Sequence, residues 1–146
     1  MAAFSRRVVV DWTGSVREGN GTAKAGTGAF TLPVSFPRRV GEPEGSTSPE
    51  ELIAAAHSAC YAMALNATVG RKNGAIARTQ VTCTVTADFG DAGIKIQSST
   101  LEVVAEGLTG IEAKDFQAVA EEAEGKCPVS NALRGSLAIS VKASVT

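Results

Sequence analysis

The sequence has no excess of charge of either sign and no long apolar run. Its 146 residues include 14 Lys and Arg against 15 Asp and Glu, for a formal net charge of -1. Nucleic-acid binding needs a basic surface, so we expect no nucleic acid partner. No apolar run approaches the roughly 20 residues of a membrane span, and the N-terminus lacks the apolar core of a signal peptide. We therefore expect a cytoplasmic protein that does not bind a membrane.

Cysteine is also scarce, with three residues, Cys60, Cys83 and Cys127. Three cysteines in a reducing compartment do not favour a structural disulfide framework. We therefore expect any disulfide here to be transient and catalytic. The chain is long enough to bury roughly two-thirds of the surface that its unfolded form exposes. We expect one domain over residues 1–146 that needs no disulfide to fold.

Residues 46–65, STSPEELIAAAHSACYAMAL, predict a helix around which the chain is organised. Ser48 at the N-cap, Pro49 at the first helical position and Glu51 three residues past the cap form a capping box. We therefore expect the helix to begin at Pro49 and to end near Gly70. Helical spacing predicts one apolar stripe, made of Leu52, Ala56, Ala59, Cys60, Met63 and Ala67.

The other segments predict an α+β fold. Residues 4–36 contain three short β-type runs separated by glycines, residues 37–48 lack any period and predict a surface loop, and residues 75–89 and 94–105 predict a long hairpin with a bulge near residues 98–99. Helical spacing returns over residues 109–124. A short helix with Cys127 at its N-cap and Pro128 at its first position follows, before a last strand over residues 137–145.

Two of the cysteines occupy positions that suit a reactive thiol. A cysteine attacks as the thiolate, and a helix N-terminus or a nearby cation lowers its pKa. Cys127 lies at a helix N-terminus, whereas Cys60 lies in the third turn and would need a cation, for which Arg38 and Arg39 are candidates. Each cysteine also fits a small buried hydrophobe. For Cys83 the alternating strand position is explanation enough.

His57, the only histidine, precedes Cys60 by three residues and is its neighbour on the helix surface. A general-base role would be tempting. However, a lone histidine among alanines usually has a structural or orienting role. We expect a structural or orienting role, with direct catalysis as the alternative.

Two blocks, S-x-S-P-E-E-L-x-x-A-A-H-x-A-C-x-x-M-A-L and G-K-C-P-V-S, together resemble the OsmC/Ohr family of thiol peroxidases. V-D-W-T-G at residues 10–14 extends the resemblance more weakly. The family implies a two-cysteine antioxidant peroxidase that reduces organic hydroperoxides and to some degree hydrogen peroxide. It also implies an intertwined homodimer, with antiparallel sheets around a long central helix and active sites at the subunit interface. The resemblance implies no metal and no prosthetic group.

Carried over by residue, Cys60 resembles the peroxidatic cysteine and Cys127 the resolving one. Glu50 resembles the carboxylate that orients a catalytic arginine. In the OsmC branch, which we favour, F-P-R-R at residues 36–39 points to Arg39, with Arg38 as an alternative. In the Ohr branch Arg17 in G-S-V-R-E-G would take the role.

The residue types at these positions suit the peroxidase reaction that the resemblance implies. Thiolate Cys60 would attack the peroxide to give a sulfenic acid, Cys127 would condense with it into a disulfide, and an external dithiol, of lipoyl or thioredoxin-like type, would reduce that disulfide. Glu50 and Cys60 are ten residues apart, or about 15 Å along an unbroken helix. If Glu50 and the arginine serve Cys60 as the resemblance implies, we therefore expect the partner chain to supply them, unless the helix bends sharply.

Three other interpretations remain open from the sequence. His57, Cys60, Cys83 and Cys127 add up to a Cys₃His zinc set, although structural zinc sites usually bring ligands in close pairs. A Cys-His acyl hydrolase would use His57 to activate Cys60. A non-catalytic ligand-binding or interaction module would keep the cysteines as core residues.

Overall fold

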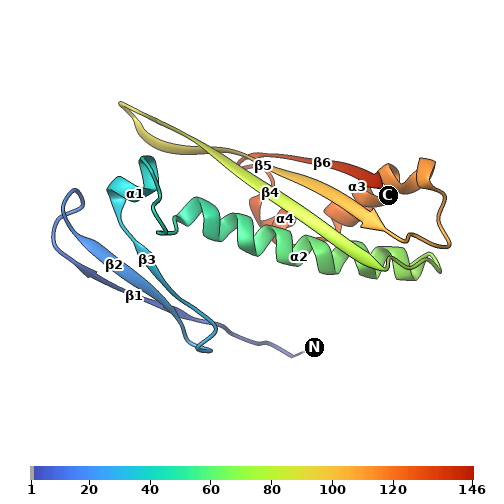
Figure 1. Cartoon of the computed structure of the whole chain (residues 1–146), viewed down its shortest axis with the longest axis horizontal. Helices are drawn as coiled ribbons and strands as arrows, with labels where there is room; N and C mark the ends of the chain where they lie inside the picture. Colours follow the sequence, from blue (N-terminus) through green and yellow to red (C-terminus); the bar gives the residue numbers. More distant parts are fainter. Residues whose placement is uncertain (1) are drawn as a thin grey trace. The chain divides into compact units, whose positions relative to one another are not determined.

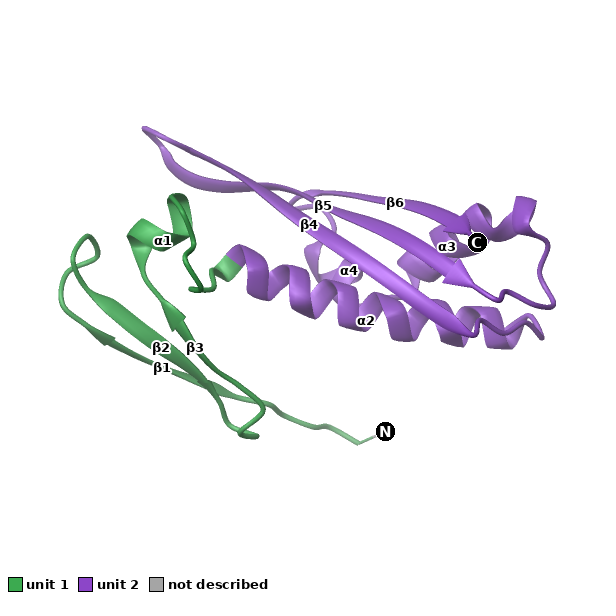
Figure 2. Cartoon of the chain, viewed as in Figure 1, with its two compact units in different colours: residues 1–49 green, residues 50–146 purple. Residues whose placement is uncertain are grey.

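The computed structural model describes residues 2–146 and divides into two compact units. The first unit ends at Pro49 and the second begins at Glu50 (Figure 2). The prediction of a single domain over residues 1–146 stays a prediction.

The first unit is a three-stranded antiparallel meander followed by a short helix (Figure 1). Its strands are β1 (Val8–Thr13), β2 (Asn20–Ala25) and β3 (Thr31–Val34), in that order across the sheet. The three strands expected from the glycine-separated runs are confirmed. Every residue of β1 is exposed, whereas alternate residues of β2 are buried.

The helix of this unit, α1 (Phe36–Val40), corrects the prediction of a loop over residues 37–48. The Ser35 hydroxyl accepts a hydrogen bond from the backbone N–H of Arg38 at 3.3 Å, and Pro37 lies in the first turn. Both are helix-start signals. The following Gly and Pro residues concealed them, because the helix is only five residues long and has no apolar period.

The second unit packs helices against one face of a three-stranded sheet (Figure 1). It contains α2 (Pro49–Arg71), β4 (Arg78–Gly90), β5 (Gly93–Glu106), α3 (Phe116–Gly125), α4 (Pro128–Leu133) and β6 (Ala138–Val145). The long helix begins at Pro49 as predicted. β4 and β5 form the predicted antiparallel hairpin, and β6 pairs with β5 in parallel, reached through α3 and α4. The α+β fold is confirmed.

The bulge and the third helix differ slightly from prediction. Thr86 lies opposite Ser98 and Ala87 opposite Ile96, so Gln97 is the extra residue, one position before the predicted bulge. The helix expected from residue 109 begins only at Phe116, after the 3-10 turn η1 (Ala113–Asp115). Gly110 has φ +77°, a left-handed conformation that a helix cannot contain.

The buried face of α2 is not the predicted stripe. Its buried residues are His57, Tyr61, Leu65, Thr68 and Val69. Met63 is 73% exposed, and Ala56, Ala59 and Ala67 are exposed as well. The larger side chains decide which face packs on the sheet, because alanine methyl groups gain little from burial. Cys60 lies at the edge of the buried face and is half-buried.

The core joins α2 to the sheet and to α3. Leu65 and Val69 of α2 pack with Leu101 of β5 and Phe116 of α3. The Tyr61 hydroxyl donates to the Ala120 carbonyl at 2.9 Å and links the two helices. The position of α2 is therefore fixed from two sides.

By length and composition alone, α2 is long and apolar enough to cross a membrane. The core helix of a soluble protein passes the same test. The sequence-based prediction that no apolar run approaches the length of a membrane span was therefore wrong for α2. The expectation that the protein does not bind a membrane stays a prediction.

Leu65→Ala tests the importance of this core. Leu65 is fully buried, so we expect the substitution to lower the free energy of unfolding by about 2–5 kcal/mol. The matched control is Lys114→Ala, which truncates an exposed side chain and should change stability by less than about 0.5 kcal/mol. Chemical denaturation measures both, and equal effects would contradict this description of the core.

Candidate active site

Cys127 is held at the start of α4. Its sulfur accepts a hydrogen bond from the backbone N–H of Ser130 at 3.5 Å, and Pro128 lies in the first turn of the helix. This N-cap geometry is the one that the sequence predicted. The side chain is completely buried and belongs to the core of the second unit.

Cys60, a residue of α2, contacts the first turn of α4. Its side chain hydrogen-bonds with the Cys127 thiol and with the backbone of Val129. All three cysteines are free thiols in this structure. The fold thus brings together the two cysteines that the sequence singled out, although they lie on helices far apart in the chain.

This environment does not favour the thiolate of Cys60. Burial raises its pKa above the ordinary value, the Val129 backbone hydrogen bond opposes that shift, and the Cys127 thiol adds to it. None of these influences is a cation. The surroundings of Cys60 within the described chain therefore favour its protonated form, and a reactive thiolate at this position would need a positive charge that they do not supply.

His57 is fully buried between the sheet and α4. Its Nδ1 lies 2.6 Å from the Ser99 hydroxyl of β5, and its Nε2 lies 2.6 Å from the Ser130 hydroxyl of α4. Burial lowers the pKa of His57, and the attraction of Glu124 opposes this shift. Both ring nitrogens are therefore occupied by serine hydroxyls, which argues against His57 as a base for Cys60.

Cys83 belongs to the surroundings of His57 and not to the thiol pair. Its sulfur lies 3.2 Å from the Ser99 hydroxyl and 3.8 Å from His57 Nδ1. Burial raises its pKa, and the Ser99 hydrogen bond lowers it by less. Residues 2–146 contain no group of three or more His, Cys, Asp or Glu side chains that could hold a metal ion, so the Cys₃His alternative loses its geometric basis.

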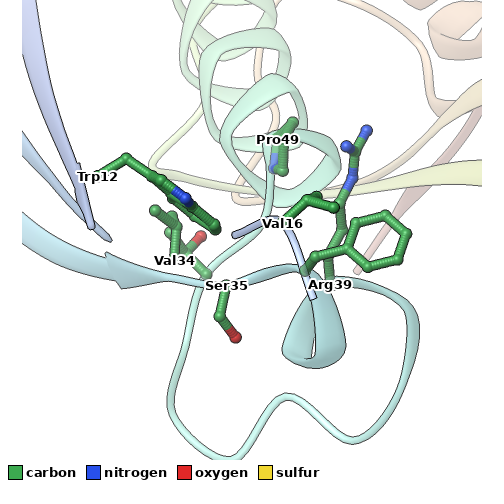
Figure 3. A pocket seen from close by; sticks show the side chains of 8 residues that line it. Trp12, Val16, Val34, Ser35, Arg39 and Pro49 are labelled. Atoms are coloured by element: carbon green, nitrogen blue, oxygen red, sulfur yellow. The ribbon is translucent and has the colours of Figure 1, made fainter. Parts of the chain in front are cut away.

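The three candidate arginines lie in the first unit. Arg17 is exposed in the turn between β1 and β2, and Arg38 forms an ion pair with Glu44. Arg39 lines a cavity of about 350 Å³ whose other walls are largely apolar (Figure 3). The lining residues are Trp12, Val16, Val34, Ser35, Phe36, Arg39, Thr47 and Pro49. Arg39 is the candidate that borders a space large enough for a small organic molecule.

Glu50 lies in the first turn of α2 and is half-buried. α2 is continuous from Pro49 to Arg71, so about 15 Å of helix separates Glu50 from Cys60. The continuous helix leaves no sharp bend that could bring the two side chains of one chain together.

Sequence reasoning missed Ser99, Ser130 and the backbone of Val129. Ser130 is part of the G-K-C-P-V-S block, so its proximity to Cys127 was available from the sequence. Ser99 carries no such signal, because a serine in a strand is common and its contact with His57 depends on how α2 packs on β5.

Comparison with known proteins supplies the family. Residues 41–142 match the family model described as OsmC-like protein. The chain is 34% identical over 129 residues to peroxiredoxin OsmC of Escherichia coli, covering 88% of this chain and 89% of that protein. It is 35% identical over 101 residues to organic hydroperoxide resistance protein OhrA of Bacillus subtilis, covering 68% of each. The crystal structure of an organic hydroperoxide resistance protein from Elizabethkingia anophelis superposes with a TM-score of 0.76 at 25% identity, covering 100% of both chains.

The burial of the His57 imidazole predicts how the stability of the protein depends on pH. Since burial lowers its pKa, folded His57 binds a proton at lower pH than the unfolded chain, whose histidine titrates near 6.5. As the pH falls below 6.5 the unfolded state takes up a proton that the folded state does not, so stability falls, by at most about 1.4 kcal/mol per pH unit from this group. Proton NMR of the single histidine should give a midpoint below 6.5. A midpoint at or above that value would contradict the assignment.

Proposed function

Because the chain belongs to the OsmC family, we propose that it is a peroxidase that reduces organic hydroperoxides, with Cys60 as the attacking thiol and Cys127 as the resolving one. Hydroperoxide reduction agrees with the names of its relatives, peroxiredoxin OsmC and organic hydroperoxide resistance protein OhrA. A longer part of the chain matches the former, which favours the OsmC branch.

The observation that carries the two-cysteine mechanism is the hydrogen bond between Cys60 and Cys127. A resolving thiol must reach the sulfur that the peroxide has oxidised, and here the two thiols already interact in the reduced protein. Cys60 is half-buried and accessible to a substrate, whereas Cys127 is fully buried. This difference supports Cys60 as the first to react.

The proposed reaction has two steps. The Cys60 thiolate attacks the distal O–H oxygen of the hydroperoxide, the O–O bond breaks, and the alkoxide takes up a proton to leave as an alcohol, so that Cys60 becomes a sulfenic acid. The Cys127 sulfur then attacks the Cys60 sulfur, the S–O bond breaks, and water leaves as the disulfide forms. An external dithiol, of lipoyl or thioredoxin-like type, reduces the disulfide and restores both thiols. No metal or prosthetic group takes part in this scheme.

Activation of Cys60 requires a cation, and we assign it to an arginine of the first unit. A guanidinium holds a thiolate and a peroxide oxygen through separate N–H groups, which suits charge that moves from sulfur to oxygen. Arg39 is preferred to Arg38 and Arg17 because it lines the apolar cavity, where an alkyl group would also fit. Glu50 would orient this arginine.

The proposed assembly is a homodimer in which the partner chain supplies the carboxylate and the arginine to Cys60. The unbroken helix between Glu50 and Cys60 supports this arrangement. Large apolar side chains are also exposed on β1 and α2, among them Val8, Val10, Trp12 and Met63. Apolar groups gathered on a strand in this way are typical of a surface that another chain covers. We place the dimer in the cytoplasm, without nucleic acid or membrane.

The geometry weakens both alternatives to a peroxidase. An acyl hydrolase would need His57 hydrogen-bonded to Cys60, but its ring nitrogens contact Ser99 and Ser130. A non-catalytic ligand-binding or interaction module would have no use for the contact between the two thiols.

The test is the consumption of cumene hydroperoxide and hydrogen peroxide by the pre-reduced protein, followed by intact mass. We expect the wild type to consume peroxide and lose two hydrogens per chain as the Cys60–Cys127 disulfide forms. Cys60→Ser should be inert, and Cys127→Ser should accumulate over-oxidised Cys60. Cys83→Ser, which changes the third cysteine, is the matched control and should behave as the wild type.

If Cys60→Ser consumed peroxide like the wild type, the assignment of the attacking thiol would be wrong. If all four proteins left both peroxides untouched, the peroxidase proposal itself would fail.

A further inference from the structure

The single histidine is a buried polar group that the reaction above does not use. Ser99, His57 and Ser130 form a continuous chain of hydrogen bonds from β5 through α2 to α4, with both distances at 2.6 Å. All three side chains are fully buried. A buried network of this kind holds its members in fixed positions, because a broken bond leaves a polar group without water.

Ser130, the last member of this hydrogen-bond network, lies in the first turn of α4, which faces Cys60. Ser130 donates its backbone N–H to the Cys127 sulfur, and the next residue toward the N-terminus, Val129, contacts Cys60 through its backbone. The Ser130 side chain is the part of this turn that His57 holds. The hydroxyl therefore connects the imidazole with the turn that presents the resolving thiol.

His57 and Cys60 both belong to α2, three residues apart, so a rigid helix fixes the distance between them. One attaches to Ser130 and the other touches Cys127 and Val129. α2 therefore contacts the first turn of α4 through two side chains, His57 and Cys60. Loss of the His57–Ser130 hydrogen bond leaves only the contacts of Cys60 with Cys127 and Val129 among these attachments.

We propose that His57 is a positioning residue that, through Ser130, holds the first turn of α4 so that the Cys127 thiol faces the Cys60 sulfur during disulfide formation. The proposal concerns the second step, in which Cys60–SOH and Cys127–SH give the disulfide and water, and it rests on the proposed function. His57 moves no proton in this role. Its neutral form, which burial favours, donates through one nitrogen and accepts through the other.

The direct test compares Ser130→Ala with Ser99→Ala. Each variant removes one 2.6 Å hydrogen bond from the same imidazole, but only Ser130 belongs to α4. In single-turnover reactions with cumene hydroperoxide, Ser130→Ala should form the Cys60–Cys127 disulfide about 10- to 100-fold more slowly, since small misplacements of reacting groups have effects of this size. Its first step should slow by less than about threefold, so over-oxidised Cys60 should accumulate. Ser99→Ala should form the disulfide at nearly the wild-type rate, and Ser130→Thr, which keeps the hydroxyl, should restore most of it.

A purely structural role for His57 predicts a different result. Both alanine variants would then lose stability to a similar degree and keep the wild-type ratio of disulfide to over-oxidised protein. That result would overturn the positioning role even if the wild type proved to be an active peroxidase.

A second measurement does not depend on peroxidase activity. In the reduced protein, alkylation of buried Cys127 by iodoacetamide, read by peptide mass, should be faster in Ser130→Ala than in the wild type and unchanged in Ser99→Ala. Equal rates in all three proteins would refute the proposal. If no protein consumed peroxide but the alkylation followed this pattern, the proposed function would fail while the hold on α4 remained.

The wild type provides a third test that no folding defect can affect. His57 is the only histidine, so its ring nitrogens give two ¹⁵N signals that need no assignment by mutation. Oxidation by diamide to the Cys60–Cys127 disulfide moves the sulfur that accepts from Ser130, and the signals should shift. Identical spectra before and after disulfide formation would contradict the coupling between His57 and the thiol pair.

Discussion

The packing of α2 against the sheet of the second unit is the constraint on which the contact between Cys60 and Cys127 depends. The two thiols meet because α2 packs on the sheet through Tyr61, Leu65 and Val69, while α3 returns the chain to place α4 beside α2. The same packing makes Cys60 a poor acid, since burial and the neighbouring thiol both raise its pKa. In the proposed mechanism, the fold of the second unit therefore places the resolving thiol, and the cation that activates Cys60 must come from elsewhere.

The first unit carries the features that the proposed activation would use. It carries the candidate arginines, an apolar cavity beside Arg39, and a strand, β1, whose residues are all exposed. Such a small meander has little core of its own, and Val8, Val10 and Trp12 gain from being covered. In the proposed homodimer one association would cover these side chains and complete the active site. Dimer formation and catalysis would then be linked, because a separated chain would lack the cation.

Local signals in the sequence were sufficient for much of the fold. The capping box at Ser48–Glu51, the alternation around Cys83 and the Cys127–Pro128 pair each act over a few residues, and they gave the start of α2, the β4–β5 hairpin and α4. The buried face of α2, the parallel pairing of β6 and the partners of His57 depend on packing between distant segments. The two cysteine blocks identified both thiols before their contact was known, but the contact of His57 with Ser99 has no local signal.

The pKa of Cys60 in solution shows whether an arginine of the first unit activates this thiol as the proposed mechanism requires. Peptide mass can follow iodoacetamide capture of Cys60 against pH in the reduced wild type and in Arg39→Met, with Arg38→Met as the matched control. We expect the pKa of Cys60 to lie below the ordinary thiol value of 9.0 in the wild type and in Arg38→Met, and to rise above it in Arg39→Met. A wild-type pKa at or above 9.0 would contradict the proposed activation.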